Sequence, residues 1–318
     1  MSFGRPYIMA VNGCIHDGWL LIRDNKNLFD TEYLLQLLSS NNMYFQYKSL
    51  ASGGVVNNLN SELVQSTTAL IPPKEEQIKI GKYFAKLDNL ITLHQRKYEK
   101  LLTMKKSCLE KMFPKNENKI PEIRFKGFTD AWEQRKLSEI VNFSRGQGLS
   151  WSDVDDKNGK FECVLYGNLY TDYDTIISKI AHKSKIKGSV LSKKFDVLMP
   201  ASDTTPTGLA RALCIINSGI SLGGDINILS PIRDNGMCIA YSLNHHKSEL
   251  IKRIKGTTVR HLQKGDIEDL KIPLPINMEE QAKISEYLYK LDNLITLHQR
   301  KVKMLQNIKK SCLEKMFL

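Results

Sequence analysis

Two segments in the second half of the chain concentrate side chains that can donate and accept hydrogen bonds. They read ASDTTPTGLAR at Ala201 to Arg211 and KRIKGTTVRHLQKGD at Lys252 to Asp266. Each combines hydroxyl groups and basic side chains with a Gly, which permits close approach of the backbone to a ligand. On an exposed loop, such groups can form bidentate hydrogen bonds to base edges or hold phosphates. In the alternative interpretation, both segments are solvated turns whose Ser and Thr side chains cap neighbouring helices.

The overall charge agrees with a polyanionic partner. The chain of 318 residues has 46 Lys and Arg against 34 Asp and Glu, which gives a net charge of +12 and a pI near 9.3. This excess favours nucleic acid, although many basic proteins carry such an excess as a solvated surface. With 42% hydrophobic and 25% charged residues, the composition is that of a globular protein long enough for two domains with cores.

Enzymatic motifs are absent from the sequence. An adenine methyltransferase would need an Asn/Asp-Pro-Pro-aromatic motif and a Gly-rich cofactor loop. The nearest approach, IPPKEE at Ile71, lacks the leading Asn or Asp and the aromatic residue. Neither GxxxxGK[ST] nor GxGxxG occurs. We therefore expect no catalysis and no cofactor, and these absences disfavour a stand-alone methyltransferase or nuclease.

Metal sites and membrane segments are not expected either. The six cysteines include no CxxC pair, so we interpret them as small buried hydrophobic residues rather than as disulfides or zinc ligands. No apolar run approaches the ~20 residues that span a bilayer. The N-terminus lacks the basic and apolar regions of a signal peptide. The expected location is the cytoplasm.

A long segment occurs twice and determines the expected architecture. Residues 76–113 and 280–317 are identical at 27 of 38 aligned positions, with an offset of 204. Apolar residues in both copies recur at alternating steps of four and three, and neither copy contains Pro, so we predict a helix over each. Spacing of seven over five heptads predicts a coiled-coil seam, and the partner of each helix is expected to be the other copy.

The seam contains polar residues at matched positions. His and Lys interrupt the apolar run in both copies, where they either set the register of the helix pair or lie at edges from which their side chains reach solvent. The first seam comprises Ile80, Phe84, Leu87, Ile91, His94, Tyr98, Leu101, Lys105, Cys108 and Met112. The second comprises Ile284, Leu288, Leu291, Ile295, His298, Val302, Leu305, Lys309, Cys312 and Met316.

Short β-type runs precede the second helix and predict a mixed α/β domain from about Ile120 to Pro275. These runs lie at Phe161–Tyr170, Lys193–Ala201, Ala210–Gly219 and Asp225–Ile232. Residues 1–73 are expected to form a partial counterpart, with a strand pair at Tyr7–Asp24 and a helix at Thr31–Ser40. The predicted fold class is α+β.

The order of these segments resembles the specificity (S) subunits of type I restriction-modification enzymes. Three sets of residues carry the resemblance: Ile272–Pro275 leading into EEQxKI at Glu279–Ile284 and KLDNLITLHQRK at Lys290–Lys301; the same pattern at Ile71–Lys79 and Lys86–Lys97; and the domain opening PEIRFKGFTDAWEQRKLSEI at Pro121–Ile140. The resemblance covers most of the chain. One of its two signatures occurs twice, and both stand in the order typical of the family.

The resemblance implies one complete and one partial target recognition domain, separated by two long helices packed as an antiparallel coiled coil. The expected boundaries are 1–75 for the partial domain, 76–118 for the central helix, 119–276 for the complete domain and 277–318 for the C-terminal helix. In this family each recognition domain reads half of a split DNA sequence. S-adenosylmethionine and ATP bind to other subunits. The implied partners are double-stranded DNA, two modification subunits, the motor-nuclease subunit indirectly, and a further copy of the chain through self-association.

In a protein of this family, the two hydroxyl-rich loops are the expected readers of bases. Their candidate residues are Ser202, Thr204, Thr205, Thr207, Arg211, Lys255, Thr257, Thr258 and Arg260. A third candidate loop is SRGQGLSW at Ser144–Trp151, with Arg145 and Gln147. In the partial domain the related candidates are Arg5, Asn57 and Asn58.

The partial domain is the departure from the family pattern. By the offset of 204, residues 1–73 correspond only to residues from about Gly208 onward, so the counterpart of residues 121–207 is expected to be missing. Such a domain would need a complement from another chain to bury its core. Two functions remain open at this point. The chain either reads a bipartite target and docks modification subunits, or is a truncated paralogue that binds them as an assembly or decoy protein.

Overall fold

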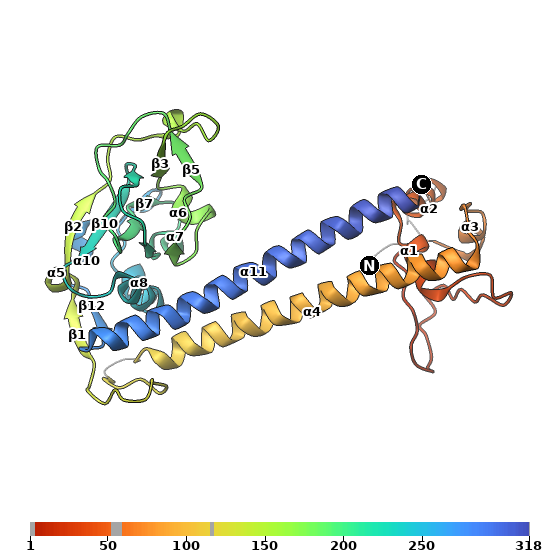
Figure 1. Cartoon of the computed structure of the whole chain (residues 1–318), viewed down its shortest axis with the longest axis horizontal. Helices are drawn as coiled ribbons and strands as arrows, with labels where there is room; N and C mark the ends of the chain where they lie inside the picture. The colour runs from red at the N-terminus through yellow and green to blue at the C-terminus, as the bar shows by residue number, and fades with distance from the viewer. Residues whose placement is uncertain (1–3, 52–58, 115–117, 318) are drawn as a thin grey trace. The chain divides into compact units, whose positions relative to one another are not determined.

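The computed structural model describes residues 4–51, 59–114 and 118–317, and it divides into two compact units. Unit 1 comprises residues 1–100 and 295–318, and unit 2 comprises residues 101–294. Each unit contains part of both long helices, α4 (Lys74–Met112) and α11 (Met278–Met316), as Figure 1 shows. These helices match the repeated segments 76–113 and 280–317 to within two residues at each end, whereas α4 ends six residues before the expected boundary at 118.

The long helices pack antiparallel in unit 1, along the predicted seam. Nδ1 of His94 lies 2.9 Å from Nδ1 of His298, and Nζ of Lys309 lies 2.6 Å from a carboxylate oxygen of Asp88. As the residue number falls along α4 it rises along α11, so the two chains run in opposite directions. The buried seam residues of both units are Phe84, Leu87, Met112, Ile284, Leu288, Leu291, Ile295 and Val302.

The same ion pair recurs in unit 2 with a buried carboxylate. Lys105 and Asp292 are the counterparts of Lys309 and Asp88 at the offset of 204, and they lie 2.5 Å apart. The hydroxyl of Tyr241 donates a second hydrogen bond to Asp292, at 2.7 Å. The matched His and Lys residues therefore make specific contacts across the helix pair, which supports the interpretation that they set its register.

Unit 2 is a mixed α/β domain built on a five-stranded sheet of order β2-β10-β6-β8-β4. Only β4 and β8 pair in parallel, and the other neighbours are antiparallel. The strands are β2 (Val141–Arg145), β4 (Ile176–Ile177), β6 (Val197–Pro200), β8 (Leu213–Ile215) and β10 (Ile226–Pro231). Together with β3 (Phe161–Val164), they place a strand in each of the four predicted β-type runs.

Smaller sheets and short helices complete unit 2. A three-stranded sheet has the order β5-β3-β9, and two ribbons pair β1 with β12 and β7 with β11. Their strands are β1 (Glu133–Lys136), β5 (His182–Ser184), β7 (Ser202–Asp203), β9 (Ser221–Leu222), β11 (Arg260–His261) and β12 (Lys271–Leu274). The helices are α5 (Leu137–Ile140), η1 (Trp151–Asp153), α6 (Asn168–Thr171), α7 (Pro206–Leu209), α8 (Gly236–His245), α9 (Lys247–Ile251) and α10 (Lys264–Ile267).

The central sheet is buried on both faces. Successive side chains of a strand point to opposite faces, so Val197 and Met199 join the core beneath α8, whereas Leu198 joins a second core with Leu169 of α6. Figure 1 shows α8 beside the first half of α11, where Tyr241 reaches Asp292. One continuous core therefore ties the sheet to the long helix within unit 2.

Unit 1 contains helices but no strand among its described residues. Its helices besides the long pair are α1 (Thr31–Leu38), α2 (Asn41–Leu50) and α3 (Ser61–Gln65). Helix α1 confirms the helix predicted at Thr31–Ser40, and Asp30 caps it by accepting a hydrogen bond from Tyr33. The strand pair predicted at Tyr7–Asp24 is wrong, because these residues are exposed, include a turn at residues 17–18 and pair with no strand among the described residues. In unit 2 the related strands β8 and β10 both pair with β6, and the described part of unit 1 offers no such strand.

The cysteines follow the prediction only in part. Cys163, Cys214 and Cys238 are buried, but Cys14 is exposed. All six are free thiols. Among the residues that the structure describes, no helix has the apolar length that a membrane span requires.

The matched ion pairs give a test of how burial sets their contribution to stability. We expect Lys105→Met to lower the free energy of unfolding by about 3 kcal/mol, because it leaves the carboxylate of Asp292 buried without its cation. Lys309→Met is the matched control and should cost less than about 1 kcal/mol, because the side chain of its partner Asp88 is 40% exposed. Urea unfolding of both variants measures their free energies of unfolding. Equal losses would contradict the expectation that burial of the carboxylate decides the contribution of each ion pair.

The same pair predicts a dependence on pH. Burial raises the pKa of Asp292, and Lys105 opposes that shift. Without Lys105 the pKa of Asp292 in the folded state rises further above its value in the unfolded state. Between these two pKa values the folded state binds more protons than the unfolded state, so the free energy of unfolding falls as the pH rises. The loss caused by Lys105→Met should therefore be larger at pH 7 than at pH 5.

Candidate nucleic-acid interface

The two hydroxyl-rich loops meet in unit 2 through a two-stranded ribbon. Strand β7 pairs antiparallel with β11, and this pairing places Asp203 opposite Arg260 and Ser202 opposite His261. The backbone N–H of Leu262 also donates to the carbonyl of Ala201 at 3.0 Å. Strand residues more than fifty positions apart in the chain therefore join the two loops into one surface.

The third candidate loop lies at the same edge of the central sheet, where β2 and β6 end and β10 begins. Arg145 ends β2 and lies opposite Asn227 of β10, next to the pairing of Ile226 with Pro200. The guanidinium of Arg145 forms an ion pair with Asp225 at 2.5 Å. The carbonyl of Asp225 in turn accepts a hydrogen bond from Ala201 at 2.9 Å. One acidic residue thus joins the Arg145 loop to the start of the hydroxyl-rich loop.

The first hydroxyl-rich loop, Ala201 to Arg211, is folded around the carboxylate of Asp203. This carboxylate accepts hydrogen bonds from the backbone N–H groups and the hydroxyls of Thr204 and Thr205. Thr205 also caps α7 by accepting from the N–H of Gly208 at 3.3 Å. Thr204 and Thr207 remain exposed, whereas Ser202 is half-buried in β7. The capping role foreseen as the alternative therefore applies to Thr205.

Arg211 points away from the exposed part of this loop. Its guanidinium donates to the carbonyls of Tyr170 and Tyr173, at the end of α6. The hydroxyl of Tyr170 donates to the carbonyl of Ser202 at 3.0 Å, so α6 and the loop hold each other in place. Burial raises the pKa of Tyr170 further above physiological pH. Arg211 thus supports the loop from behind.

The second loop closes into a tight turn at Gly256. Lys255 and His261 exchange two backbone hydrogen bonds, of 3.2 and 2.8 Å, and Gly256 adopts a φ of +104°, which favours Gly over residues with a side chain. Thr257 and Thr258 are exposed at the tip of this turn.

The basic side chains of the second loop differ in their pairing. Nε of Arg260 is buried and has no hydrogen-bond partner among the described residues. Lys255 lies 2.6 Å from Asp266. Burial by itself would raise the pKa of Asp266, but hydrogen bonds from Lys255 and from the backbone of Gln263 outweigh it and lower the pKa.

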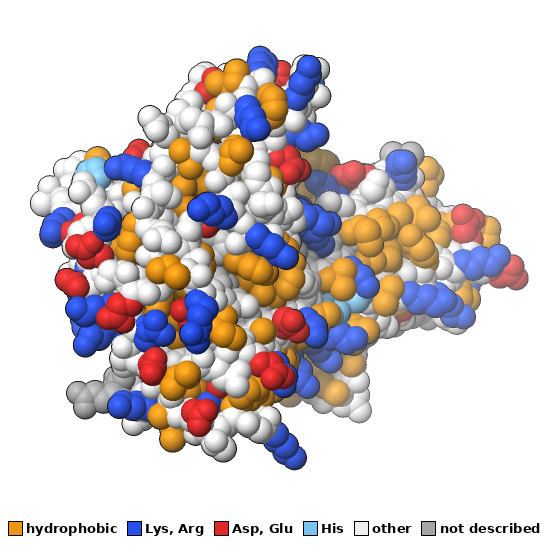
Figure 2. All heavy atoms as spheres, turned by 60° about the vertical axis from the view of Figure 1, so that its left-hand side comes forward, with side chains coloured by type: hydrophobic (Ala, Val, Ile, Leu, Met, Phe, Trp, Pro, Cys, Tyr) orange, Lys and Arg blue, Asp and Glu red, His pale blue; other side chains and the backbone are white. Residues whose placement is uncertain are grey.

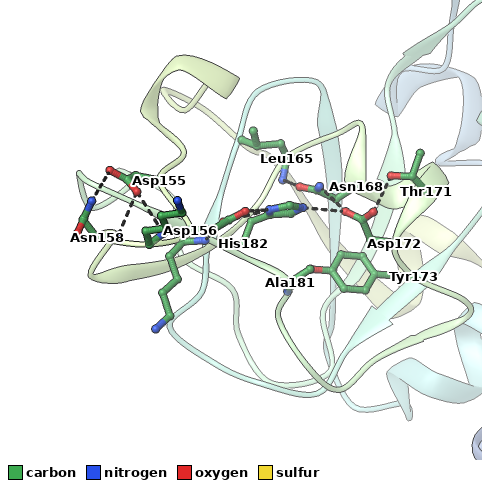
Figure 3. A network of polar contacts seen from close by, with 12 residues as sticks. Asp155, Asp156, Asn158, Leu165, Asn168, Thr171, Asp172, Tyr173, Ala181 and His182 are labelled. Atoms are coloured by element: carbon green, nitrogen blue, oxygen red, sulfur yellow. Dashed lines mark hydrogen bonds and ion pairs between the residues drawn. The ribbon is translucent and has the colours of Figure 1, made fainter. Parts of the chain in front are cut away.

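A polar network supports the loops from behind (Figure 3). Both ring nitrogens of His182 contact carboxylates, Nδ1 that of Asp156 at 2.9 Å and Nε2 that of Asp172 at 3.1 Å. Asn168 donates to Asp172 at 2.6 Å and accepts from the backbone of Leu165 at 2.8 Å. The network fixes α6, whose Tyr170 contacts the hydroxyl-rich loop. No group of three or more His, Cys, Asp or Glu side chains in the described part of the chain is arranged to hold a metal ion.

Charge is dispersed over this part of the molecule. Figure 2 shows Lys and Arg side chains separated by acidic and apolar side chains on the visible face. Arg145 and Lys255 are both paired with aspartates, and Gln147 is exposed. Several partly neutralised cations therefore surround neutral hydroxyl and amide donors, a composition suited to contacts with both phosphates and base edges.

The candidates in unit 1 are less well defined by the structure. Arg5 is exposed, and its guanidinium lies 5.5 Å from the ring centroid of Tyr7. Asn57 and Asn58 lie outside the described residues.

Sequence reasoning missed the residues that hold the loops together, namely Tyr170, Asp203 and Asp225. Asp203 was inside a chosen loop, and its position before two Thr residues was a usable signal for a capping carboxylate. Tyr170 and Asp225 act over separations of 32 and 80 residues, and no local pattern signals such contacts.

Comparison with known proteins shows the family of this chain. The family model described as the type I restriction modification DNA specificity domain matches residues 8–103 and 129–307. The chain belongs to this family. Two relatives are specificity subunits of Methanocaldococcus jannaschii. That of the type I restriction enzyme MjaVIII is 24% identical over 95% of this chain and 73% of its own length. The putative MjaX subunit is 28% identical over 92% of this chain and 68% of its own length.

Solved structures show the same fold. The specificity subunit of Thermoanaerobacter tengcongensis is 20% identical, with a TM-score of 0.50 over 93% of this chain and 72% of its own. That of M. genitalium is 14% identical, with a TM-score of 0.64 over 92% of this chain and 73% of its own. The predicted family and the predicted α+β fold class with two paired long helices are thus confirmed for this specificity subunit.

The two arginines of the joined loops should respond differently to substitution. Arg211→Ala leaves the carbonyls of Tyr170 and Tyr173 without a donor, so we expect the free energy of unfolding to fall by about 1–3 kcal/mol. Arg260→Ala, which removes a bond of 3.3 Å to Gly256 in an exposed turn, should change it by less than about 1 kcal/mol. Urea unfolding followed by circular dichroism compares them. A larger loss for Arg260→Ala would show that Arg211 is not the supporting residue.

Proposed function

We propose that this specificity subunit reads DNA with unit 2 and has no catalytic step of its own. The observation that carries the proposal is the joining of the three candidate loops at one edge of the central sheet. The edge presents Thr204, Thr207, Thr257 and Thr258 as exposed hydroxyls, with basic side chains around them. Such a surface can hold phosphates with its cations while its hydroxyls test the base edges. The cytoplasm, where such DNA lies, would be its place of action.

In this proposal, residues 119–276 are the complete target recognition domain and read one half of a split target. The long helices would be the spacer between reading domains. Each has 39 residues and hence a length of about 58 Å, which exceeds the ~34–36 Å of one DNA turn. Reading of the other half-site would require a complete first recognition domain. Unit 1 would contribute the helices of that domain.

The long helices would also dock two modification subunits, in line with the pattern of the family, and through them the motor-nuclease subunit.

 Their exposed apolar side chains in unit 1 support this proposal, because large apolar groups on a long helix pair are a typical surface for partner helices. The spacing of three, four and seven residues places them on one side of each helix. They are Leu90, Leu93, Leu297, Met304 and Ile308, each 38–54% exposed.

Selection from a pool of duplex DNA tests the reading function. The full chain together with its modification subunit should enrich a defined sequence at moderate salt, where phosphate attraction does not mask specificity. A split motif would indicate two working reading domains. A single half-site or its palindrome would indicate reading by residues 119–276 alone. A complex that forms without any enrichment would contradict the proposal.

Two substitutions in the Gly256 turn separate base reading from phosphate binding. Thr258→Val keeps the shape but removes the hydroxyl, so it should weaken binding to the selected sequence by about 1–3 kcal/mol and leave other DNA unaffected. Lys255→Gln should weaken binding to all sequences and reduce the salt slope by about 1. Fluorescence anisotropy over a range of salt concentrations measures both effects. If neither variant changes binding, the turn does not contact DNA.

The docking surface is tested by placing charge on it. We expect the double variant Leu93→Glu, Leu297→Glu to lose its complex with the modification subunit in size-exclusion chromatography, because both side chains are about half exposed and would be buried by a partner helix. The control is Asn307→Glu, an exposed position on the same helix that lies outside the apolar side. A complex that survives the double variant would refute this surface.

A further inference from the structure

The long helices meet at their middle in a contact between two imidazoles, which belongs to unit 1. His94 of α4 and His298 of α11 are counterparts at the offset of 204, and each directly follows the central residue of its helix. Their Nδ1 atoms lie 2.9 Å apart, and their ring centroids lie 5.1 Å apart. Two copies of one residue therefore face each other across the helix pair through the same nitrogen.

This contact is compatible with only some protonation states. A separation of 2.9 Å between two nitrogens is that of a hydrogen bond, in which one nitrogen donates its N–H and the other accepts through a lone pair. A neutral imidazole has one nitrogen of each kind, so two neutral rings, or one neutral and one charged ring, can form the bond. Two charged rings cannot, because both Nδ1 atoms would then carry a proton and neither would have a lone pair.

The charged groups around the two rings oppose their protonation. Partial burial, followed by the charges of Lys301 and Lys97, lowers the pKa of His94. Burial, followed by His94 and the same two lysines, lowers the pKa of His298. No carboxylate of the described residues is among the groups that shift either ring. Both helices therefore contribute charges that disfavour a doubly charged pair.

The two ion pairs of the same helices are built differently. Each of them joins a cation to an anion, Lys309 to Asp88 and Lys105 to Asp292. In the contact of His94 with His298, two bases face each other, so protonation of both turns an attraction into a repulsion.

We propose that His94 and His298 form a pH-sensitive contact, which holds the helices of unit 1 together near neutral pH and loosens their packing when both rings are charged. The pKa of both rings in the folded state lies below its ordinary value of 6.5, so below that pH the unfolded state binds more protons than the folded state. The contribution of the contact to stability is thus complete above about pH 6.5 and is lost as the pH falls toward the lower pKa values of the folded state.

An NMR titration of the seven His residues in the full chain tests the contact directly. We expect His94 and His298 to titrate below the ordinary pKa of His. The double variant Lys97→Gln, Lys301→Gln should move both titrations to higher pH, because the loss of like charges favours protonation.

The matched control for this titration is the double variant Lys100→Gln, Lys303→Gln. It removes the same charge from exposed positions of the same two helices, and neither lysine is among the groups that shift the rings. It should move the titrations less. Titration of both rings at or above the ordinary value in the wild-type chain would overturn the proposal, as would equal responses to the two double variants.

Urea unfolding of a variant without the titrating groups measures the effect on stability. His94→Asn with His298→Asn keeps a donor and an acceptor at each position but removes the charge change, and Asn and His have similar helix propensities. The urea midpoint of the wild-type chain should fall more between about pH 7 and pH 5 than that of this variant. The control is His16→Asn, at a side chain that is 79% exposed, which should behave as the wild-type chain does. Equal falls in the wild-type chain and the double His variant would overturn the proposal.

A consequence for assembly rests on the proposed docking function. Leu93 and Leu297 directly precede the two His residues and are 47% and 45% exposed. Looser packing of the helices would change the spacing of these side chains. The complex with the modification subunit should therefore weaken from about pH 7 to pH 5 for the wild-type chain, and less for the double His variant.

Equal weakening of both complexes would overturn this link between the contact and docking. The titration and the unfolding experiment need no modification subunit, so failure of the pH-sensitive contact and failure of the docking surface are separate results. Circular dichroism of each variant verifies that the helices persist.

Discussion

The antiparallel pairing of α4 with α11 is the interaction on which the rest of the structure depends. Two helices with similar sequences bury one seam. Because the segments repeat at an offset of 204, contacts between the helices recur at matched positions in the two units. Asp88 with Lys309 and Asp292 with Lys105 are such a pair. A shift of register by one turn would separate both carboxylates from their cations and expose seam residues. The ion pairs therefore add specificity to an association that apolar burial drives.

The two versions differ because their surroundings differ. In unit 2 the carboxylate of Asp292 also accepts from Tyr241 of α8, whereas in unit 1 that of Asp88 accepts from Gln36 of α1. Helices α8 and α1 thus take the same place on the helix pair, one backed by a five-stranded sheet and the other by no sheet in the described residues. The sheet explains why Asp292 is buried while Asp88 remains partly exposed.

The candidate loops are also positioned by this core, through the central sheet. Helix α8 packs on the face of the sheet that contains Val197 and Met199, and α6 packs on the other. Three residues then hold the loops in place. Arg211 donates to the carbonyl of Tyr173, Tyr170 donates to the carbonyl of Ser202, and Asp225 bonds to both Arg145 and Ala201. Loops fixed in this way can present hydroxyls in a defined geometry, which base recognition requires.

The sequence by itself determined the elements whose signals are local or repeated. The period of the apolar residues located both long helices, and the short β-type runs located β3, β6, β8 and β10 of unit 2. It also suggested the candidate loops, because hydroxyl and basic residues around Gly are visible without a structure. Only the tertiary structure decided that β7 and β11 join these loops, that Arg211 turns inward, and that residues 7–24 form no strand pair. Strand pairing and side-chain direction depend on partners far away in the chain. Residues with the same local pattern therefore form a strand or an inward contact in one place and not in another.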